Sequence, residues 1–137
     1  MTNIYISHSI RGRLGDKATP ESMKANCDKA IEFGNWLRAK FHDVKFYVPG
    51  EMDGFLMEHG ITPVDLVEEL LGLDCGIIGH SDGLIVFEPD DYISGGMCIE
   101  LAYAEEHGVK TCDVDSINSA SDQLLEQIIY NFLKGLE

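Results

Sequence analysis

Short β-rich segments that alternate with helical stretches along the 137-residue chain predict an α/β fold. We expect a doubly wound (Rossmann-like), mostly parallel sheet of four to five strands with helices on both faces. The clearest strand is GLIVFE, residues 83–88, a continuous apolar run typical of a strand that is covered on both sides. No internal repeat, low-complexity segment or linker interrupts the pattern, so residues 1–137 are expected to form a single domain.

Four segments have the composition of β-strands. Each is short, rich in β-branched and aromatic residues, and followed by a polar or glycine-containing turn. In the first of them, strand alternation places Ile4 and Ile6 on one face and Tyr5 on the other, where Tyr5 either packs or lines a pocket. The four segments are residues 3–7, 44–48, 83–88 and 109–114.

Helices are expected between these strands and after the last one. Thr19 and Pro20 supply an N-cap and an N1 proline for a helix that extends to Lys40. Residues 49–61 predict a loop or a short helix, whose Met and Phe side chains either close over a ligand or join the core. A further helix starts at Thr62 and Pro63 and reaches about Leu71, and a second helical piece at 73–82 weakens at Gly76 and Gly79. Another helix includes Glu100 and ends near Gly108, and the last helical segment covers residues 119–136.

The charge balance restricts the partners. Ten Lys and Arg against 24 Asp and Glu give a formal net charge of −14, which repels nucleic acids and anionic lipid surfaces. No stretch approaches the roughly 20 apolar residues that a membrane span requires. We therefore predict no nucleic-acid partner and no membrane partner, and small anions held by local positive groups as the charged ligands.

The four cysteines have no C-x-x-C spacing, and no apolar signal segment precedes the first strand. Both observations favour free thiols in a reducing, cytoplasmic setting. The five histidines neither pair at i, i+4 nor join a cysteine cluster. The sequence therefore predicts neither a metal site nor a cofactor.

Two loops are expected at the carboxyl edge of the sheet, residues 7–13 after the first strand and residues 90–96 after the third. Ligands of open α/β sheets bind in the crevice at this edge. Both loops have the composition of anion cradles, with backbone amides at a helix N-terminus, hydroxyl groups and one guanidinium. The residues concerned are Ser94, Gly95 and Gly96 in one loop and Ser9, Arg11 and Gly12 in the other.

Glu100 is a single acidic residue within the apolar helical run of SGGMCIELAYAEEHG, residues 94–108. A glutamate on a helix is commonly a solvated surface residue, and we interpret Glu105 and Glu106 in that way. The strand, glycine loop and helix that precede Glu100 place it instead at the carboxyl-edge crevice.

Two stretches resemble a known family: IYISHSIRGR at the N-terminus, and SDGLIVFEPDDYISGGMCIELAYAEEHGVK. They are similar to the nucleoside 2-deoxyribosyltransferase superfamily, over most of residues 3 to 112. The paired S-I-R-G and S-x-G elements resemble the 2′-deoxynucleoside 5′-phosphate N-hydrolase branch more closely than the transferases, which tend to have an acidic residue in place of Ser94.

The resemblance implies a role for each matching residue. Glu100, in E-L-A-Y-A, matches the glutamate that attacks the anomeric carbon. Asp74 and Asp82 match the Asp-x7-Asp pattern before the third strand. Asp82 is then expected to be the catalytic, proton-handling carboxylate, or else a turn residue before the third strand. Asp74 is expected to bind substrate, to orient other groups or to cap a helix. The residues implied to contact the 5′-phosphate are Ser9, Ile10, Arg11, Gly12, Ser94 and Gly96.

The sequence also departs from the family pattern. His8 replaces a small residue, Asp90 and Asp91 add an acidic pair, and residues 50–61 match no family element. These departures leave the choice of base open. The family further implies a homodimer in which the neighbouring subunit completes the site.

The expected function is hydrolysis of the N-glycosidic bond of a (deoxy)ribonucleoside 5′-monophosphate, giving free base and sugar 5-phosphate through a glycosyl-glutamate intermediate. Three alternatives remain open from the sequence. They are a nucleoside 2-deoxyribosyltransferase, an NAD glycohydrolase similar to TIR domains, and a nucleotide-binding module without activity.

Overall fold

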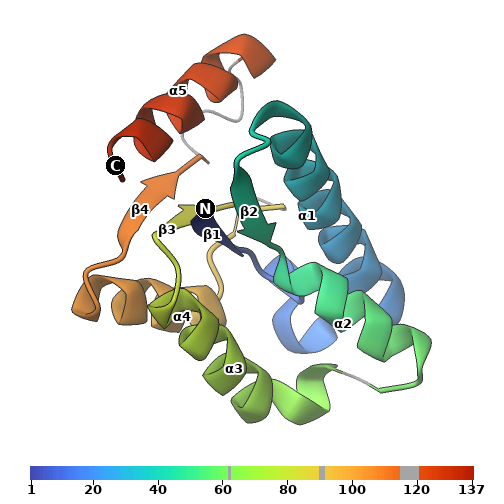
Figure 1. Cartoon of the computed structure of the whole chain (residues 1–137). Helices are drawn as coiled ribbons and strands as arrows, with labels where there is room; N and C mark the ends of the chain where they lie inside the picture. Colours follow the sequence, from blue (N-terminus) through green and yellow to red (C-terminus); the bar gives the residue numbers. More distant parts are fainter. Residues whose placement is uncertain (62, 90–91, 115–120) are drawn as a thin grey trace.

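The computed structural model describes residues 1–61, 63–89, 92–114 and 121–137. Its centre is a four-stranded sheet in the order β2-β1-β3-β4, and every pair of neighbouring strands is parallel (Figure 1). The prediction of an α/β, doubly wound fold is therefore confirmed. The strands are β1 (Thr2–Ser7), β2 (Val44–Tyr47), β3 (Gly83–Val86) and β4 (Lys110–Asp113).

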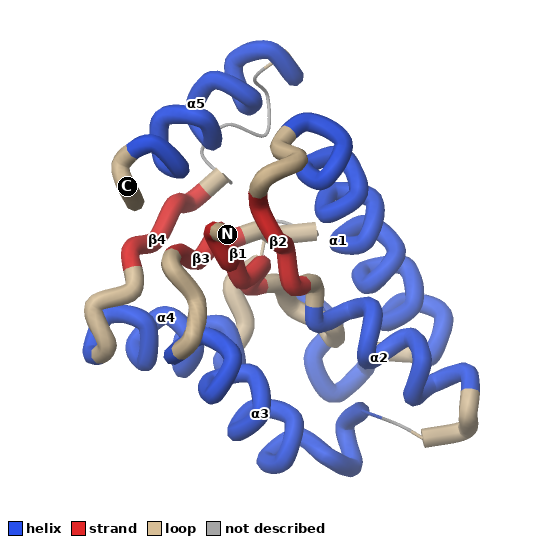
Figure 2. The backbone as a smooth tube through the Cα atoms, in the orientation of Figure 1, coloured by secondary structure: helices blue, strands red, loops and turns tan. Residues whose placement is uncertain are grey.

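Helices cover both faces of the sheet, as Figure 2 shows. Ile4 and Ile6 of β1 face a cluster that includes residues of α1 and α5, whereas Tyr5 faces a cluster with residues of α3 and α4. The strand alternation expected for β1 is therefore present. The helices are α1 (Pro20–Lys40), α2 (Pro49–Glu58), α3 (Val67–Gly79), α4 (Gly95–Glu106) and α5 (Asp122–Lys134), with 3-10 turns η1 (Gly12–Lys17) and η2 (Pro63–Leu66).

The strand register brings the two predicted loops together. Ser7, the last residue of β1, pairs with Val86, the last residue of β3. Chain segments that leave these two strands therefore start side by side at the carboxyl edge. Ser94 caps α4 by accepting a hydrogen bond from the Met97 amide (3.2 Å), so the loop after β3 ends in a defined helix N-terminus.

One of the two alternatives for residues 49–61 is confirmed, because residues 49–58 form the helix α2, on which Met52 and Phe55 are exposed rather than in the core. Two other local predictions differ from the structure. The loop after β1 contains the turn η1. The two helical pieces expected around residues 63–82 are a single helix, α3, that continues through Gly76 to Gly79. A Cβ on Gly79 would lie 3.2 Å from the Tyr103 hydroxyl of α4, so the close approach of the two helices accounts for that glycine.

Some expectations fall outside the described residues. These are the acidic pair Asp90 and Asp91, the helix start at Thr62, and the first part of the segment 119–136. Within the described ranges, no helix combines the length and the apolar character needed to cross a membrane.

Candidate active site at the carboxyl edge

A cavity of about 370 Å³ opens at the carboxyl edge, between the loops after β1 and β3 and the helices α2, α3 and α4. This volume is within the range of small-molecule sites. The structure brings most of the predicted site residues together around it. Those that line the cavity are Ser9, Ile10, Arg11, Gly12, Asp74, Ser94, Gly95, Gly96 and Glu100.

Glu100 is buried, with 5% of its surface exposed, although it lies on the second turn of a helix. Two hydroxyl groups donate to its carboxylate. The Tyr5 hydroxyl donates to Oε2, and the Ser7 hydroxyl donates to Oε1 over 2.8 Å. Tyr5 and Ser7 are two residues apart on β1 and therefore share one face of the strand. The two donors of strand β1 thus hold the carboxylate in position at the wall of the cavity.

Tyr5 supports the site from beneath rather than lining it. Its side chain is fully buried and stacks on Tyr47 with ring centroids 5.6 Å apart. Burial, followed by the negative charge of Glu100, raises the Tyr5 pKa well above its ordinary value. The hydroxyl therefore stays protonated and acts as a permanent hydrogen-bond donor to Glu100.

Three carboxyl groups share the cavity: Glu100 from α4, Asp74 from α3 and Asp53 from α2. Burial raises the pKa of Glu100 to about 7, against the hydrogen bonds from Tyr5 and Ser7, and the charges of Asp74 and Asp53 add to the increase. Burial also raises the pKa of Asp74 to about 6, and that of Asp53 to about 7 with a contribution from Asp74. The cluster therefore retains protons near neutral pH, which acid–base chemistry requires.

Asp82 does not belong to this cluster, which corrects its predicted role. The residue is exposed and immediately precedes Gly83, the first residue of β3, at the amino edge of the sheet. Its Oδ2 accepts from the Asn3 amide and its own amide donates to the Asn3 carbonyl, each over 2.8 Å. Helix α3 returns the chain to the amino edge, so Asp74 remains at the site while Asp82 aligns β3 with β1.

The loop after β1 contributes a buried hydroxyl with no partner. Ser9 is 2% exposed, and its Oγ is the only buried side-chain oxygen or nitrogen of the described residues that lacks a hydrogen bond. Such a group destabilises a folded chain unless a ligand or water satisfies it. Gly12 has a φ of 61°, which favours glycine, and the Asn26 side chain holds the loop by donating to the Ile10 carbonyl (2.9 Å). The hydroxyl is therefore held in place beside the cavity.

The glycines at the start of α4 are not required by crowding. A Cβ on Gly95 would meet no atom within 4 Å, and one on Gly96 would meet only the Ser94 hydroxyl at 3.8 Å. The space that a Cβ atom would occupy at these two residues is open, and both glycines line the cavity. An anion can thus approach the positive end of the α4 dipole closely.

Arg11 supplies the cation of the site. Its Nη1 is paired with Asp16 at 2.9 Å, and its side chain is 35% exposed while that of Asp16 is 99% exposed. An ion pair with so exposed an acid is weak. Arg11 can therefore exchange this partner for an anion bound in the cavity.

Sequence reasoning missed Asp53, Ser7 and the position of His8. The His8 imidazole is buried, and burial lowers its pKa to about 4. Its Nε2 accepts from the Gly50 amide (2.9 Å) and its Nδ1 lies 3.1 Å from the Ser9 carbonyl. The neutral ring thus joins the loop after β1 to the start of α2. Strand alternation from Tyr5 could have revealed Ser7, whereas no local pattern marks Asp53.

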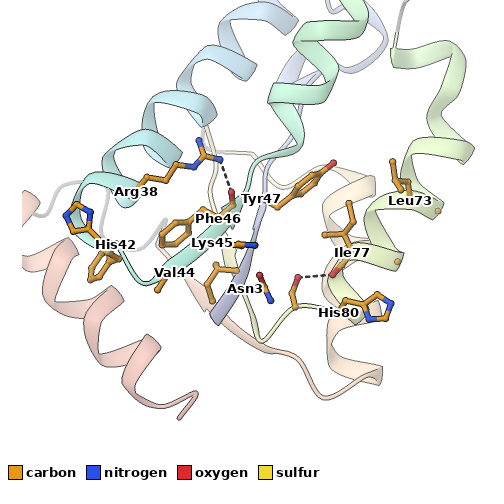
Figure 3. A pocket seen from close by; sticks show the side chains of 15 residues that line it. Asn3, Arg38, His42, Val44, Lys45, Phe46, Tyr47, Leu73, Ile77 and His80 are labelled. Atoms are coloured by element: carbon orange, nitrogen blue, oxygen red, sulfur yellow. Dashed lines mark hydrogen bonds between the residues drawn. The ribbon is translucent and has the colours of Figure 1, made fainter. Parts of the chain in front are cut away.

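A larger cavity, about 1070 Å³, runs along the edge strand β2 between α1 and α3 (Figure 3). Tyr47, Leu73 and Ile77 contribute apolar walls, and Arg38 donates to the Phe46 carbonyl over 2.8 Å. No aspartate or glutamate lines it, and among the described residues none of its buried polar side-chain atoms lacks a partner. Of the two cavities, the smaller one therefore contains the carboxyl groups and the unpartnered hydroxyl.

Among the described residues no three His, Cys, Asp or Glu side chains form a group that could hold a metal ion. Comparisons with protein-family models, with curated proteins and with solved structures find no match.

Proposed function

We propose that the protein is an N-glycosidase that hydrolyses nucleoside 5′-monophosphates to free base and sugar 5-phosphate. One observation carries the proposal. A single cavity combines a carboxylate held by two hydroxyl donors, Glu100, with an anion cradle made of the unpartnered Ser9 hydroxyl and the N-terminus of α4. The first feature suits attack on a sugar carbon, and the second suits a phosphate.

The spacing of these two features is compatible with one substrate. Ser94 caps α4 and Glu100 follows six residues later on the same helix, which corresponds to about 9 Å along the axis. Helical side chains tilt toward the N-terminus, so the Glu100 carboxylate lies closer to the cradle than this rise. A pentose with a 5′-phosphate can therefore place its phosphate on the amides of Gly95 and Gly96 while its anomeric carbon faces Glu100.

In the proposed mechanism Glu100 attacks the anomeric carbon as the bond to the base breaks. The hydrogen bonds from Tyr5 and Ser7 favour its ionised form. The electron pair of the breaking bond goes to the base nitrogen, which takes a proton from Asp74. Asp74, now ionised, accepts a proton from a water molecule that attacks the glycosyl–Glu100 ester, which releases the sugar phosphate and restores both carboxyl groups.

Asp74 takes the acid–base role for two reasons. It lies on the wall of the same cavity, and burial raises its pKa to about 6 against a hydrogen bond from Tyr5, so Asp74 and Glu100, whose pKa is about 7, can share a proton near neutral pH. It also interacts electrostatically with both Tyr5 and Glu100, which supports a joint role of the two carboxyl groups.

The test is incubation with a panel of ribo- and deoxyribonucleoside 5′-monophosphates, followed by chromatography of the free bases. We expect release of base and sugar 5-phosphate, and no release from the corresponding unphosphorylated nucleosides. Addition of a second free base separates hydrolysis from transfer, because a transferase would form a new nucleotide. Tight nucleotide binding without release, unchanged in Glu100→Gln, would contradict the proposal and favour a binding module.

The proposal extends to a homodimer in a reducing, cytoplasmic setting. All four cysteines are free, which suits that setting. Helices α2, α3 and α4, which frame the cavity, each carry an exposed large apolar residue: Phe55, Leu73 and Ile99. Light scattering of the purified protein would test the dimer, and a monomer at micromolar concentration would contradict it.

A further inference from the structure

The carboxyl group of Asp53 has no role in the mechanism above, yet it is nearly inaccessible. Asp53 is 4% exposed, and its side chain faces the cavity from α2. Among the described residues no hydrogen bond or ion pair involves its carboxyl group, whose oxygens, unlike the enclosed Ser9 hydroxyl, remain accessible from the cavity, and its electrostatic neighbours include the like-charged Asp74. A desolvated carboxyl without a donor is costly, so a ligand that supplies donors would account for it.

Contacts of the first turn of α2 with neighbouring segments fix the position of Asp53. The Gly50 amide donates to the buried His8 ring, and a Cβ on Gly50 would lie 3.0 Å from His8 Cε1 and 3.3 Å from the Cys27 Cα. The first turn of α2 is therefore held tightly against the loop after β1 and against α1. Asp53 follows Gly50 by three residues, one helical turn later, and inherits this placement.

The topology indicates which part of a substrate Asp53 would meet. The anion cradle is formed by the loops after β1 and β3, and Glu100 belongs to the helix after β3. Asp53 belongs to α2, the helix after β2. In the sheet, β2 and β3 lie on opposite sides of β1. Leu70 and Leu71 of α3 line the cavity as well and supply apolar surface for a planar ring. With the phosphate in the cradle and the sugar at Glu100, the base extends toward Asp53.

We propose that Asp53 is the specificity-determining residue of the site, and that it selects nucleobases with an exocyclic amine by accepting hydrogen bonds from their Watson–Crick edge. The inference rests on the proposed function, because it assumes a nucleotide in this orientation.

The chemistry of the bases gives the expected order. The N1–H and N2–H₂ groups of guanine can donate to both oxygens of an ionised carboxyl, and cytosine and adenine offer one exocyclic amine each. Uracil and thymine present an N–H between two carbonyl oxygens, which face the carboxylate unfavourably. The site should therefore act best on guanine, then on cytosine and adenine, and worst on uracil and thymine.

The experiment compares kcat/KM for GMP, CMP, AMP and UMP and their deoxy forms at pH 8, where an Asp53 carboxyl with a pKa of about 7 is ionised. We expect the guanine nucleotides to exceed the uracil nucleotides by about 10- to 100-fold in the wild type. In Asp53→Asn this ratio should fall to within a few-fold of one. Glu58→Gln removes the same charge from an exposed position of α2 and should leave the ratio unchanged.

Binding to Glu100→Gln, measured by calorimetry, gives the same comparison without turnover. If guanine nucleotides bind more tightly but the wild type releases no base, the proposed hydrolysis is contradicted, while the role of Asp53 in base selection is still supported. Equal rates and affinities for all bases, or an equal loss for all bases in Asp53→Asn, would overturn the inference. The affinity of Asp53→Asn for ribose 5-phosphate checks its fold, and we expect the wild-type value.

Discussion

Polar side chains at the two edges of the sheet differ in their exposure and in their hydrogen-bond partners. At the amino edge, Asp82 is exposed and exchanges two hydrogen bonds with the Asn3 backbone. At the carboxyl edge, Asp53 has no hydrogen-bond partner among the described residues, and the Ser9 hydroxyl is buried without one. The chain itself thus satisfies Asp82 at the amino edge, whereas at the carboxyl edge it satisfies Glu100 with two hydroxyl donors and leaves Ser9 and Asp53 without partners. We propose that this difference separates a residue that aligns strands from residues that bind a ligand.

Loss of the Glu100 carboxylate should give the largest effect at the carboxyl edge. Glu100→Gln keeps the size of the side chain and removes the nucleophile, so we expect kcat to fall by at least about 1000-fold. Base release measured by chromatography is the readout. Glu105→Gln, on the exposed side of α4, should keep wild-type activity. Residual activity within tenfold of the wild type would remove Glu100 from the reaction.

The pair Asp74 and Asp82 tests the two edges directly. Asp74→Asn removes the proposed acid, so kcat should fall by about 100- to 10,000-fold while nucleotide binding persists. Asp82→Asn weakens only the hydrogen bond to Asn3, so it should cost at most about 1 kcal/mol of unfolding free energy and leave kcat unchanged. Chemical denaturation and initial rates measure both. Equal losses of kcat in the two variants would contradict the assignment of these edges.

The pH dependence of stability should differ between wild type and Asp53→Asn. The pKa of Asp53 is raised from 3.8 to about 7 in the folded state, so the wild type loses stability as pH rises from about 4 through 7. Above pH 7 the variant should be more stable than the wild type by about 2 to 4 kcal/mol, and below pH 4 this advantage should vanish. Urea denaturation at pH 4.5, 6 and 8 measures the difference.

The buried His8 acts in the opposite direction but is common to both proteins. Its pKa is lowered to about 4, so its contribution to stability is lost as pH falls from about 6.5 toward 4. The subtraction of the two unfolding free energies removes this contribution. An advantage of the variant that stays constant from pH 4.5 to 8 would show that the Asp53 carboxyl is not forced to ionise against burial.

These residues also explain which parts of the molecule the sequence could predict. The parallel sheet and the position of Glu100 follow from local patterns, namely the apolar run of β3 and the glycine turn before α4. The continuity of α3 does not, because glycine at 76 and 79 lowers helix propensity while packing on Tyr103 favours the helix. The spacing of Asp74 and Asp82 gives a distance along the chain and not the edge at which each residue lies. Asp53 becomes part of the site only through the contact of His8 with Gly50, which no local pattern encodes.

The smallest expected effect is the most direct test of the comparison. In Ser9→Ala the removed hydroxyl has no partner in the free protein, so stability should stay the same or increase by up to about 1 kcal/mol. The affinity for inorganic phosphate and for nucleotide should nevertheless fall by about 5- to 10-fold, since one neutral hydrogen bond to the ligand is lost.

Ser22→Ala provides the matched control, because Ser22 accepts from the Thr19 amide in the capping box of α1 (2.9 Å). It should cost about 1 kcal/mol of stability and leave phosphate affinity unchanged. A destabilised Ser9→Ala protein with wild-type phosphate affinity would instead assign Ser9 to the scaffold, and the carboxyl edge would then lose the anion cradle that distinguishes it from the amino edge.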